Sequence, residues 1–299
     1  MTALTAHRPR RLNSQARAGW FFLAPSLLII GVFVIYPIVQ SLWMSLHDWS
    51  FFQTQHPFVG LANYVELLGD PRFWNALANT GIFTIVTVPA QIVLGLLLAV
   101  RLRRTTWWTL FLRSVFFFPV ISSFATMAIV WKFILSANVG PTAAWLRGVG
   151  ISPTDWLHNP DWALPAVIVV GLWKNIGFTM VILLAALQDV DESLVEASVL
   201  DGAGPWRRFV SVSLPSIRQA LLFSSVIATI GSLQVFDQVY VMTQGGPLFR
   251  SETLVTYIYE QGFTEFRSGY ASAIAWGLFL IIMLVSVLQL RIFRFRDVD

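Results

Sequence analysis

Two otherwise apolar stretches of the chain, 163–188 and 219–241, each carry a short group of side chains that could bind a polar molecule. Amides donate and accept hydrogen bonds, lysine and aspartate bind opposite charge, and an indole ring stacks on another ring. Such groups are costly inside a membrane, about 2.5–3.5 kcal/mol for a lysine at the centre of a helix, so they indicate a polar pathway. The candidates are Trp173, Lys174 and Asn175 in the first stretch and Gln234, Asp237 and Gln238 in the second.

The spacing of these residues leaves several roles open. Gln234, Asp237 and Gln238 follow an i, i+3, i+4 pattern, which predicts one shared helix face. Lys174 either pairs with the nearest carboxylate within a span, that of Asp237, as a structural ion pair, or faces a wet cavity where it would meet an anionic solute. Trp173 either stacks on a solute or packs in the interior.

The elements that must position these residues are membrane helices. The chain has 299 residues, of which 56% are hydrophobic and 12% charged, and a mean hydropathy of +0.67. Soluble domains carry about 25% charged residues. Crossing a membrane takes about 20 apolar residues. Six stretches meet or approach this length, so we predict an all-α polytopic protein with six transmembrane helices, within 18–46, 73–100, 114–131, 163–188, 219–241 and 268–290.

Arginine placement predicts the orientation of the six helices. If the N-terminus is cytoplasmic, fourteen of the eighteen arginines fall on cytoplasmic segments and four on external ones. Such a bias is typical of membrane proteins, so the net charge of +4 needs no nucleic-acid partner. We therefore expect both termini inside. The predicted organisation is a cytoplasmic tail (1–17), the first helix (18–46), a partly helical external loop (47–79), a core with five helices (80–293) and a second cytoplasmic tail (294–299).

Several kinds of chemistry are missing from the sequence. The chain has no cysteine, which excludes disulfides and thiolate sites. Gly-Lys occurs nowhere, so the phosphate-binding loop G-x-x-x-x-G-K-[ST] is absent. The four histidines show no metal-ligand spacing. We expect no metal, no cofactor and no enzymatic activity in this chain alone.

A polar segment between the fourth and fifth helices, EASVLDGAGPWRRFVSVSLP, begins at Glu196 and is predicted to form a helical hairpin on the cytoplasmic side. Ser193 and Glu196 form an S-x-x-E capping box at the start of a first helix. Gly202 and Gly204 permit the left-handed backbone of a tight turn, and Pro205 suits the first position of a second helix. The whole element spans 189–217. On these features alone, it could be an ordinary amphipathic loop on the membrane surface.

The same segment resembles the E-A-A-x-x-x-G-x9-I-x-L-P signature of bacterial ABC-importer permeases. Ser198 replaces the second alanine and Val212 the isoleucine, whereas the other signature positions match. The resemblance implies that the hairpin, over 193–215, docks on a separate ATP-hydrolysing subunit. For Glu196, capping and docking are both open. We assign to coupling Glu196, Ala197, Ser198, Asp201, Gly202, Ala203, Leu214 and Pro215.

Further stretches resemble the carbohydrate-uptake branch of that family, maltose and glycerol-phosphate permeases included. They are PSLLIIGVFVIYP (25–37), FVGLANYVELLGDPRFWNALANT (58–80) and LQVFDQVYVMTQGGP (233–247). The resemblance implies an importer subunit in the bacterial cytoplasmic (inner) membrane. Its partners would be a second homologous permease, a homodimeric ABC ATPase, an extracytoplasmic solute-binding protein and membrane lipid. Its solute would be a sugar or oligosaccharide, with glycerol 3-phosphate or a glycerophosphodiester second. An ion-coupled secondary transporter is a remote alternative.

Overall fold

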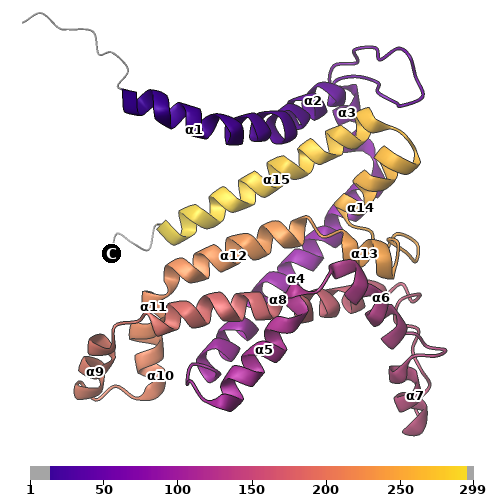
Figure 1. Cartoon of the computed structure of the whole chain (residues 1–299). Coiled ribbons are helices and arrows are strands. Elements are labelled where there is room, and N and C mark those ends of the chain that lie inside the picture. Colours follow the sequence, from indigo (N-terminus) through magenta and orange to yellow (C-terminus); the bar gives the residue numbers. More distant parts are fainter. Residues whose placement is uncertain (1–13, 295–299) are drawn as a thin grey trace, which may run out of the picture.

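The computed structural model describes residues 14–294, with side chains from residue 19 to residue 292. The tails predicted at 1–17 and 294–299 therefore lie mostly outside the described residues. The described chain is helical and contains no strand, which confirms the all-α prediction (Figure 1). In chain order its helices are α1 (Ser14–Ile30), α2 (Tyr36–Ser45), α3 (Ala62–Gly69), α4 (Pro71–Arg101), α5 (Trp107–Ile121), α6 (Phe124–Ile134), α7 (Pro141–Gly148), α8 (Ala163–Gln188), α9 (Glu192–Leu200), α10 (Pro205–Arg208), α11 (Leu214–Ser216), α12 (Arg218–Leu233), α13 (Asp237–Met242), α14 (Leu254–Tyr259) and α15 (Ser268–Arg294), with π-helical turns η1 (Gly31–Ile35), η2 (Phe209–Ser213) and η3 (Glu260–Thr264).

Five helical stretches of the described chain are long and apolar enough to cross a membrane, and α5 with α6 makes a sixth if the pair counts as one span. Of the predicted helices, 163–188 coincides with α8. The continuous third helix predicted over 114–131 is wrong, because α5 and α6 meet at 103°. Ser122 and Ser123 have extended ψ angles of 148° and 134° at the break. Pro119, close to the break, lacks the N–H that an unbroken helix would use there.

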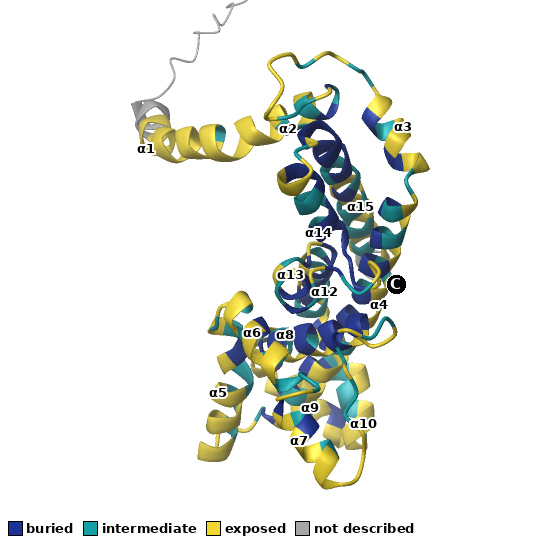
Figure 2. Cartoon of the chain, turned by 90° about the vertical axis from the view of Figure 1, so that its right-hand side faces the viewer, coloured by how far each residue is buried: buried dark blue, intermediate teal, exposed yellow. Residues whose placement is uncertain are grey.

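Helix α8 packs closely against α4 and α5 because glycines lie where these helices meet. A Cβ atom added to Gly95 on α4 would lie 2.7 Å from the Thr179 side chain, and one added to Gly177 would overlap the carbonyl oxygen of Phe116 on α5. Buried residues lie along α8 and its neighbours, and a second group of them lies around α14 and the start of α15 (Figure 2). By contrast, α1 is exposed along its described length, and its apolar side chains are therefore available to lipid or to a partner chain.

The ends of the long helices fall on two sides of the bundle. The start of α1, the end of α15 and the hairpin of α9 and α10 lie together on the left in Figure 1. Helices α2, α3, α13 and α14 lie at the opposite end. The predicted loop at 47–79 contains α3 and the first turns of α4. The described ends of α1 and α15 therefore lie on the same side of the bundle as the hairpin.

Candidate functional site

The fifth span is interrupted at the residues that the sequence singled out. Helix α12 ends at Leu233, and α13 begins at Asp237. Phe236, between them, has φ −136° and ψ −67°, outside the helical region. The prediction that Gln234, Asp237 and Gln238 share one helix face is therefore wrong, since no single helix carries all three. Irregular backbone at membrane depth persists where it is buried in protein or lines a wet cavity.

A cavity of about 380 Å³ lies at this interruption, between α4, α8 and the two broken spans. Its wall includes Val120 and Phe124 on either side of the break in the third span. Its polar lining comprises Thr87, Gln91, Asn175, Ser232, Gln234, Asp237 and Gln238. The structure thus brings together four of the six predicted pathway residues, Asn175, Gln234, Asp237 and Gln238. The other two, Trp173 and Lys174, do not line this cavity.

The amide groups of this lining are only partly engaged by the protein. Gln91 Nε2 donates to Thr179 Oγ1 at 2.8 Å, and Asn175 Nδ2 donates to the Gly171 carbonyl at 3.0 Å. Gln238 Oε1 and Thr87 Oγ1 are buried and have no hydrogen-bond partner among the described residues. Buried polar atoms are normally paired, so these two atoms are left unsatisfied within the described residues.

Gln91 and Thr87 are lining residues that the sequence analysis did not identify. Gln91 is an uncharged polar residue inside the apolar stretch 73–100. The rule that selected Asn175 applies to it equally, because a buried amide in a span needs a polar partner. Thr87 carries no such signal, because the hydroxyl of a threonine in a membrane helix commonly donates its hydrogen bond to a backbone carbonyl of the same helix.

Lys174 does not pair with Asp237, so the ion-pair alternative for this lysine is wrong. Lys174 is 4% exposed, and its ammonium group donates to backbone carbonyl oxygens at the end of α5: Pro119 at 2.8 Å, Val120 at 3.3 Å and Ser122 at 2.7 Å. An ammonium group has three N–H donors, and all three have partners here. Its positive charge also lies 4.7 Å from the centre of the Phe124 ring. Through these hydrogen bonds Lys174 therefore stabilises the broken backbone of the third span.

Trp173 packs against Trp131, with ring centres 5.4 Å apart and the rings nearly perpendicular. Trp131 lines a separate, apolar pocket of about 290 Å³ between α6, α7 and the start of α8. This geometry is the edge-to-face contact common in protein interiors.

The cytoplasmic hairpin forms largely as predicted, with two corrections. The N-cap of α9 is Asp191, not Ser193: Asp191 Oδ1 accepts a hydrogen bond from the Ser193 backbone N–H at 2.9 Å. This bond holds the pKa of the exposed Asp191 carboxyl below its ordinary value. Gly202 has the predicted left-handed backbone, with φ +73°, whereas Gly204 is the extended N-cap of α10 at φ −66°.

The hairpin presents an apolar surface to solvent. Leu200 at its tip is 88% exposed and Trp206 on α10 is 77% exposed. Of the predicted coupling residues, Glu196, Ala197, Asp201, Gly202 and Pro215 are exposed, Ala203 and Leu214 are half-buried, and Ser198 is buried. Ser198 Oγ donates to the Val195 carbonyl at 2.6 Å, inside the hairpin. Glu196 makes no hydrogen bond or ion pair within the described residues, so its carboxylate is free for a partner.

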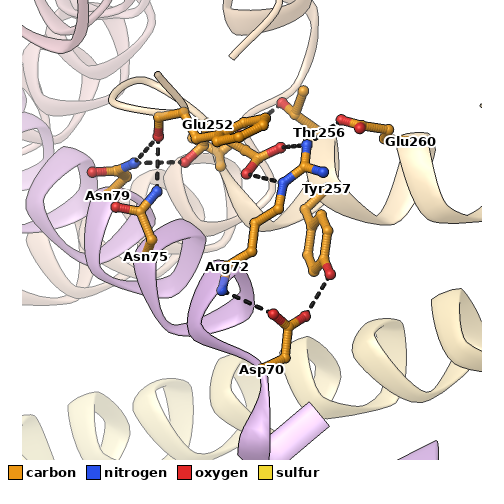
Figure 3. Close-up of polar contacts among 10 residues, drawn as sticks. Asp70, Arg72, Asn75, Asn79, Glu252, Thr256, Tyr257 and Glu260 are labelled. Atoms are coloured by element: carbon orange, nitrogen blue, oxygen red, sulfur yellow. Dashed lines mark hydrogen bonds and ion pairs between the residues drawn. The ribbon is translucent and has the colours of Figure 1, made fainter. Parts of the chain in front are cut away.

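At the opposite end, a network of charged residues ties α4 to the segment before α14 (Figure 3). Arg72 donates through Nε and Nη2 to the two carboxylate oxygens of Glu252, at 3.0 and 2.6 Å, and also pairs with Glu260. Glu252 is 1% exposed. Burial raises the pKa of the Glu252 carboxyl above its ordinary value, although the Arg72 guanidinium opposes that rise. No motif in the sequence pointed to this pair, whose members lie 180 positions apart.

Asp70 supports the same network from the N-cap of α4. Its Oδ1 accepts from the Arg72 backbone N–H at 2.8 Å, and its Oδ2 accepts from the hydroxyls of Tyr257 and Tyr270 at 2.5 and 2.6 Å. Burial by itself would raise the pKa of Asp70, but these hydrogen bonds outweigh it and hold the pKa below its ordinary value. The N-terminus of α4 is therefore anchored to both α14 and α15.

Residues 91–296 match the model of a protein family, the inner membrane component of binding-protein-dependent transport systems. The match covers more than half of the chain. The chain belongs to this permease family. The permease is 38% identical over 278 residues to the lactose transport system permease protein LacF of Rhizobium radiobacter, covering 91% of this chain and 92% of that protein. It is 32% identical over 284 residues to the trehalose/maltose transport system permease protein MalF of Thermococcus litoralis, covering 94% and 95%.

Solved structures agree with this assignment at the level of the fold. The permease superposes on a chain of a bacterial ABC transporter involved in import of the acidic polysaccharide alginate, with a TM-score of 0.84, 22% identity and coverage of 97% and 100%. At this identity the likeness shows the fold alone. The family predicted from the hairpin motif is confirmed, as is the predicted multi-pass membrane fold. Within residues 14–294 no three potential metal ligands cluster.

Proposed function

We propose that the permease forms, with a second homologous permease, the pathway of an ATP-driven importer for a neutral sugar or oligosaccharide. The observation that carries the proposal is the amide-lined cavity at the two interrupted spans. Its volume of about 380 Å³ lies within the range of small-molecule sites, about 300–1,000 Å³. Glutamine and asparagine both donate and accept hydrogen bonds, as hydroxyl groups require.

The charges around the cavity favour a neutral solute over glycerol phosphate. Asp237 is the one ionisable residue of the lining, and its charge would repel an anion. The ammonium group of the nearby Lys174 already donates its three N–H groups to backbone carbonyl oxygens. An anionic solute would therefore meet no free positive charge at this point of the described chain. The names of LacF and MalF, with lactose and with trehalose and maltose, support the same choice.

The hairpin would couple this pathway to a homodimeric ATPase. Exposed leucine and tryptophan side chains on a projecting element are typical of a docking surface. The free Glu196 carboxylate could pair with a basic side chain of the ATPase. A movement of the hairpin would reach the cavity because α8 and α12, which flank the hairpin in the chain, both contribute lining residues. An extracytoplasmic binding protein would deliver the solute to the other end, and both termini would be cytoplasmic.

The test is solute-stimulated ATP hydrolysis by the permease reconstituted in lipid with its co-encoded permease, ATPase and binding protein. Neutral sugars and glycerol phosphates are screened in parallel. Gln234→Leu and Gln238→Leu should reduce transport of the active sugar by about tenfold or more, because a buried polar contact is worth about 1–3 kcal/mol. Gln219→Leu, at the exposed cytoplasmic start of α12, is the matched control.

Coupling is tested separately in the hairpin. Glu196→Ala combined with Gly202→Asp should abolish stimulation while solute still binds, whereas Glu192→Ala in the first turn of the same helix should retain it. Stimulation by an anion alone would overturn the neutral-solute proposal. Uptake driven by an ion gradient without ATP would instead identify a secondary transporter.

A further inference from the structure

The interruption of the fifth span depends on a hydroxyl group from outside the span. The Val235 carbonyl lies directly before the N-cap of α13, at the break between α12 and α13. It accepts a hydrogen bond from Thr253 Oγ1 at 3.0 Å. Thr253 is fully buried. A carbonyl released from a helix inside a membrane needs such a donor, because lipid supplies none. Thr253 therefore stabilises the broken backbone from which Gln234 and Gln238 enter the cavity.

Thr253 is in turn held in place by its neighbours in sequence. Glu252 is the buried partner of Arg72, and Leu254 N–H donates to Thr80 Oγ1 on α4 at 2.9 Å. Asn79 Nδ2 donates to the Glu252 carbonyl at 3.0 Å. Three consecutive residues of the 252–254 segment are thus fixed to α4 or to the break, and Figure 3 shows Arg72 and Asn79 converging on this segment from one helix.

The connection that precedes this segment is strained. Gln244, Leu248 and Phe249 have φ angles of 53°, 52° and 58°, in the left-handed region that non-glycine residues seldom occupy. Strained backbone persists when surrounding contacts over-determine it, and it gathers at functional sites. Here the Phe249 carbonyl accepts from Asn75 and Asn79, at 2.8 and 3.0 Å. The Arg72 guanidinium lies 3.9 Å from the centre of the Phe249 ring.

We propose that Arg72, Glu252 and Thr253 are positioning residues that hold the break of the fifth span, and with it Gln234 and Gln238, in the geometry that shapes the cavity. The role of the cavity as the solute pathway rests on the proposed function above, but the positioning of the break does not. Removing the buried pair takes away one of the contacts that fix residues 252–254, so the hydrogen bond from Thr253 to Val235 opens more often and Val235 becomes more accessible to water.

The chain contains no cysteine, so a single introduced cysteine reports on one position. Val235→Cys places a thiol at the break, where Val235 is 7% exposed. Val190→Cys is the matched reporter, since Val190 is 6% exposed in a separate core cluster at the cytoplasmic end of α8. The rate of reaction with a water-soluble maleimide is measured in the lipid-reconstituted transporter. Each reporter is combined with Glu252→Gln, with Thr253→Val and with Thr253→Ser.

The expected result is a rise of about tenfold or more in the reaction rate of Val235→Cys with Glu252→Gln and with Thr253→Val, equivalent to about 1.4 kcal/mol of easier opening. Thr253→Ser keeps the hydroxyl and should restore the slow rate. Val190→Cys should react equally slowly in every background. Glu66→Gln, which removes an exposed ion pair with Arg267 on the same side, should leave both reporters unchanged.

An equal rise at both reporters would mean that the substitutions loosen the whole bundle, and it would overturn the positioning role. No rise at Val235→Cys would overturn it too. Thr253→Val leaves every charge in place, so the test stands even if Glu252→Gln fails to fold. If Gln234→Leu leaves transport intact while Val235→Cys still responds, the cavity is not the pathway, but the positioning role remains.

Discussion

Replacing Lys174 with methionine tests whether its ammonium group holds the third span together or serves the solute. The two short hydrogen bonds, to the carbonyls of Pro119 and Ser122, are charge-assisted and worth about 1.5–3 kcal/mol each. Against this gain stands the cost of burying a lysine in a span, about 2.5–3.5 kcal/mol, which methionine avoids. Taking the middle of each range, the net loss of stability is about 1.5 kcal/mol.

The assay measures the Tm of the detergent-solubilised permease. Its readout is the fraction of the protein that stays monodisperse after heating. For a chain of this size, each kcal/mol shifts Tm by about 2–4 °C, so we expect Lys174→Met to lower Tm by about 3–6 °C. Transport of every solute should fall together, because Val120 and Phe124 on the cavity wall would move. Lys132→Met, which changes the exposed lysine of α6, is the matched control and should leave Tm unchanged.

The reasoning would be refuted if the Lys174→Met permease had the same Tm as the wild type and had lost only the transport of an anionic solute. That result would show that the ammonium group faces the pathway and that its carbonyl contacts contribute little. Lys174→Arg refines the test, since guanidinium keeps the charge but has a planar donor geometry that does not match three carbonyls at one helix end.

Two further predictions concern the packing of α8 and the anchor of α4. Gly177→Ala should lower Tm by at least about 2–4 °C, because its Cβ would overlap the Phe116 carbonyl oxygen and overpacking costs about 1–3 kcal/mol; Gly148→Ala, where a Cβ meets nothing within 4 Å, is the control. Asp70→Asn should lower the free energy of unfolding at pH 7 by about 1 kcal/mol after solvent screening, and the difference from wild type should shrink below about pH 4. The folded pKa of Asp70 lies below its unfolded value, so its stabilisation is complete above the unfolded pKa and is lost as the pH falls through the folded one. A difference that stays constant from pH 7 to pH 3 would contradict this assignment.

The membrane helices and the cytoplasmic hairpin were predictable because each rests on local rules. Apolar length defines a span, which is why the predicted 163–188 helix coincides with α8. A turn that needs positive φ needs a glycine, and Gly202 supplies it at φ +73°. The selection of Asn175, Gln234 and Gln238 followed from the cost of burying an amide in lipid, and that cost is the same wherever the helix packs.

Only the tertiary structure decided where the spans break and which groups compensate for the breaks. The interruption after Leu233 persists because Thr253 satisfies the Val235 carbonyl, and the break at Ser122 persists because Lys174 satisfies the end of α5. These donors come from other parts of the chain, 18 and 52 positions away in sequence. The Arg72–Glu252 pair spans 180 positions. A helix pattern cannot reveal such partners, since hydrogen bonds and ion pairs act over a few ångströms in space without regard to distance along the chain.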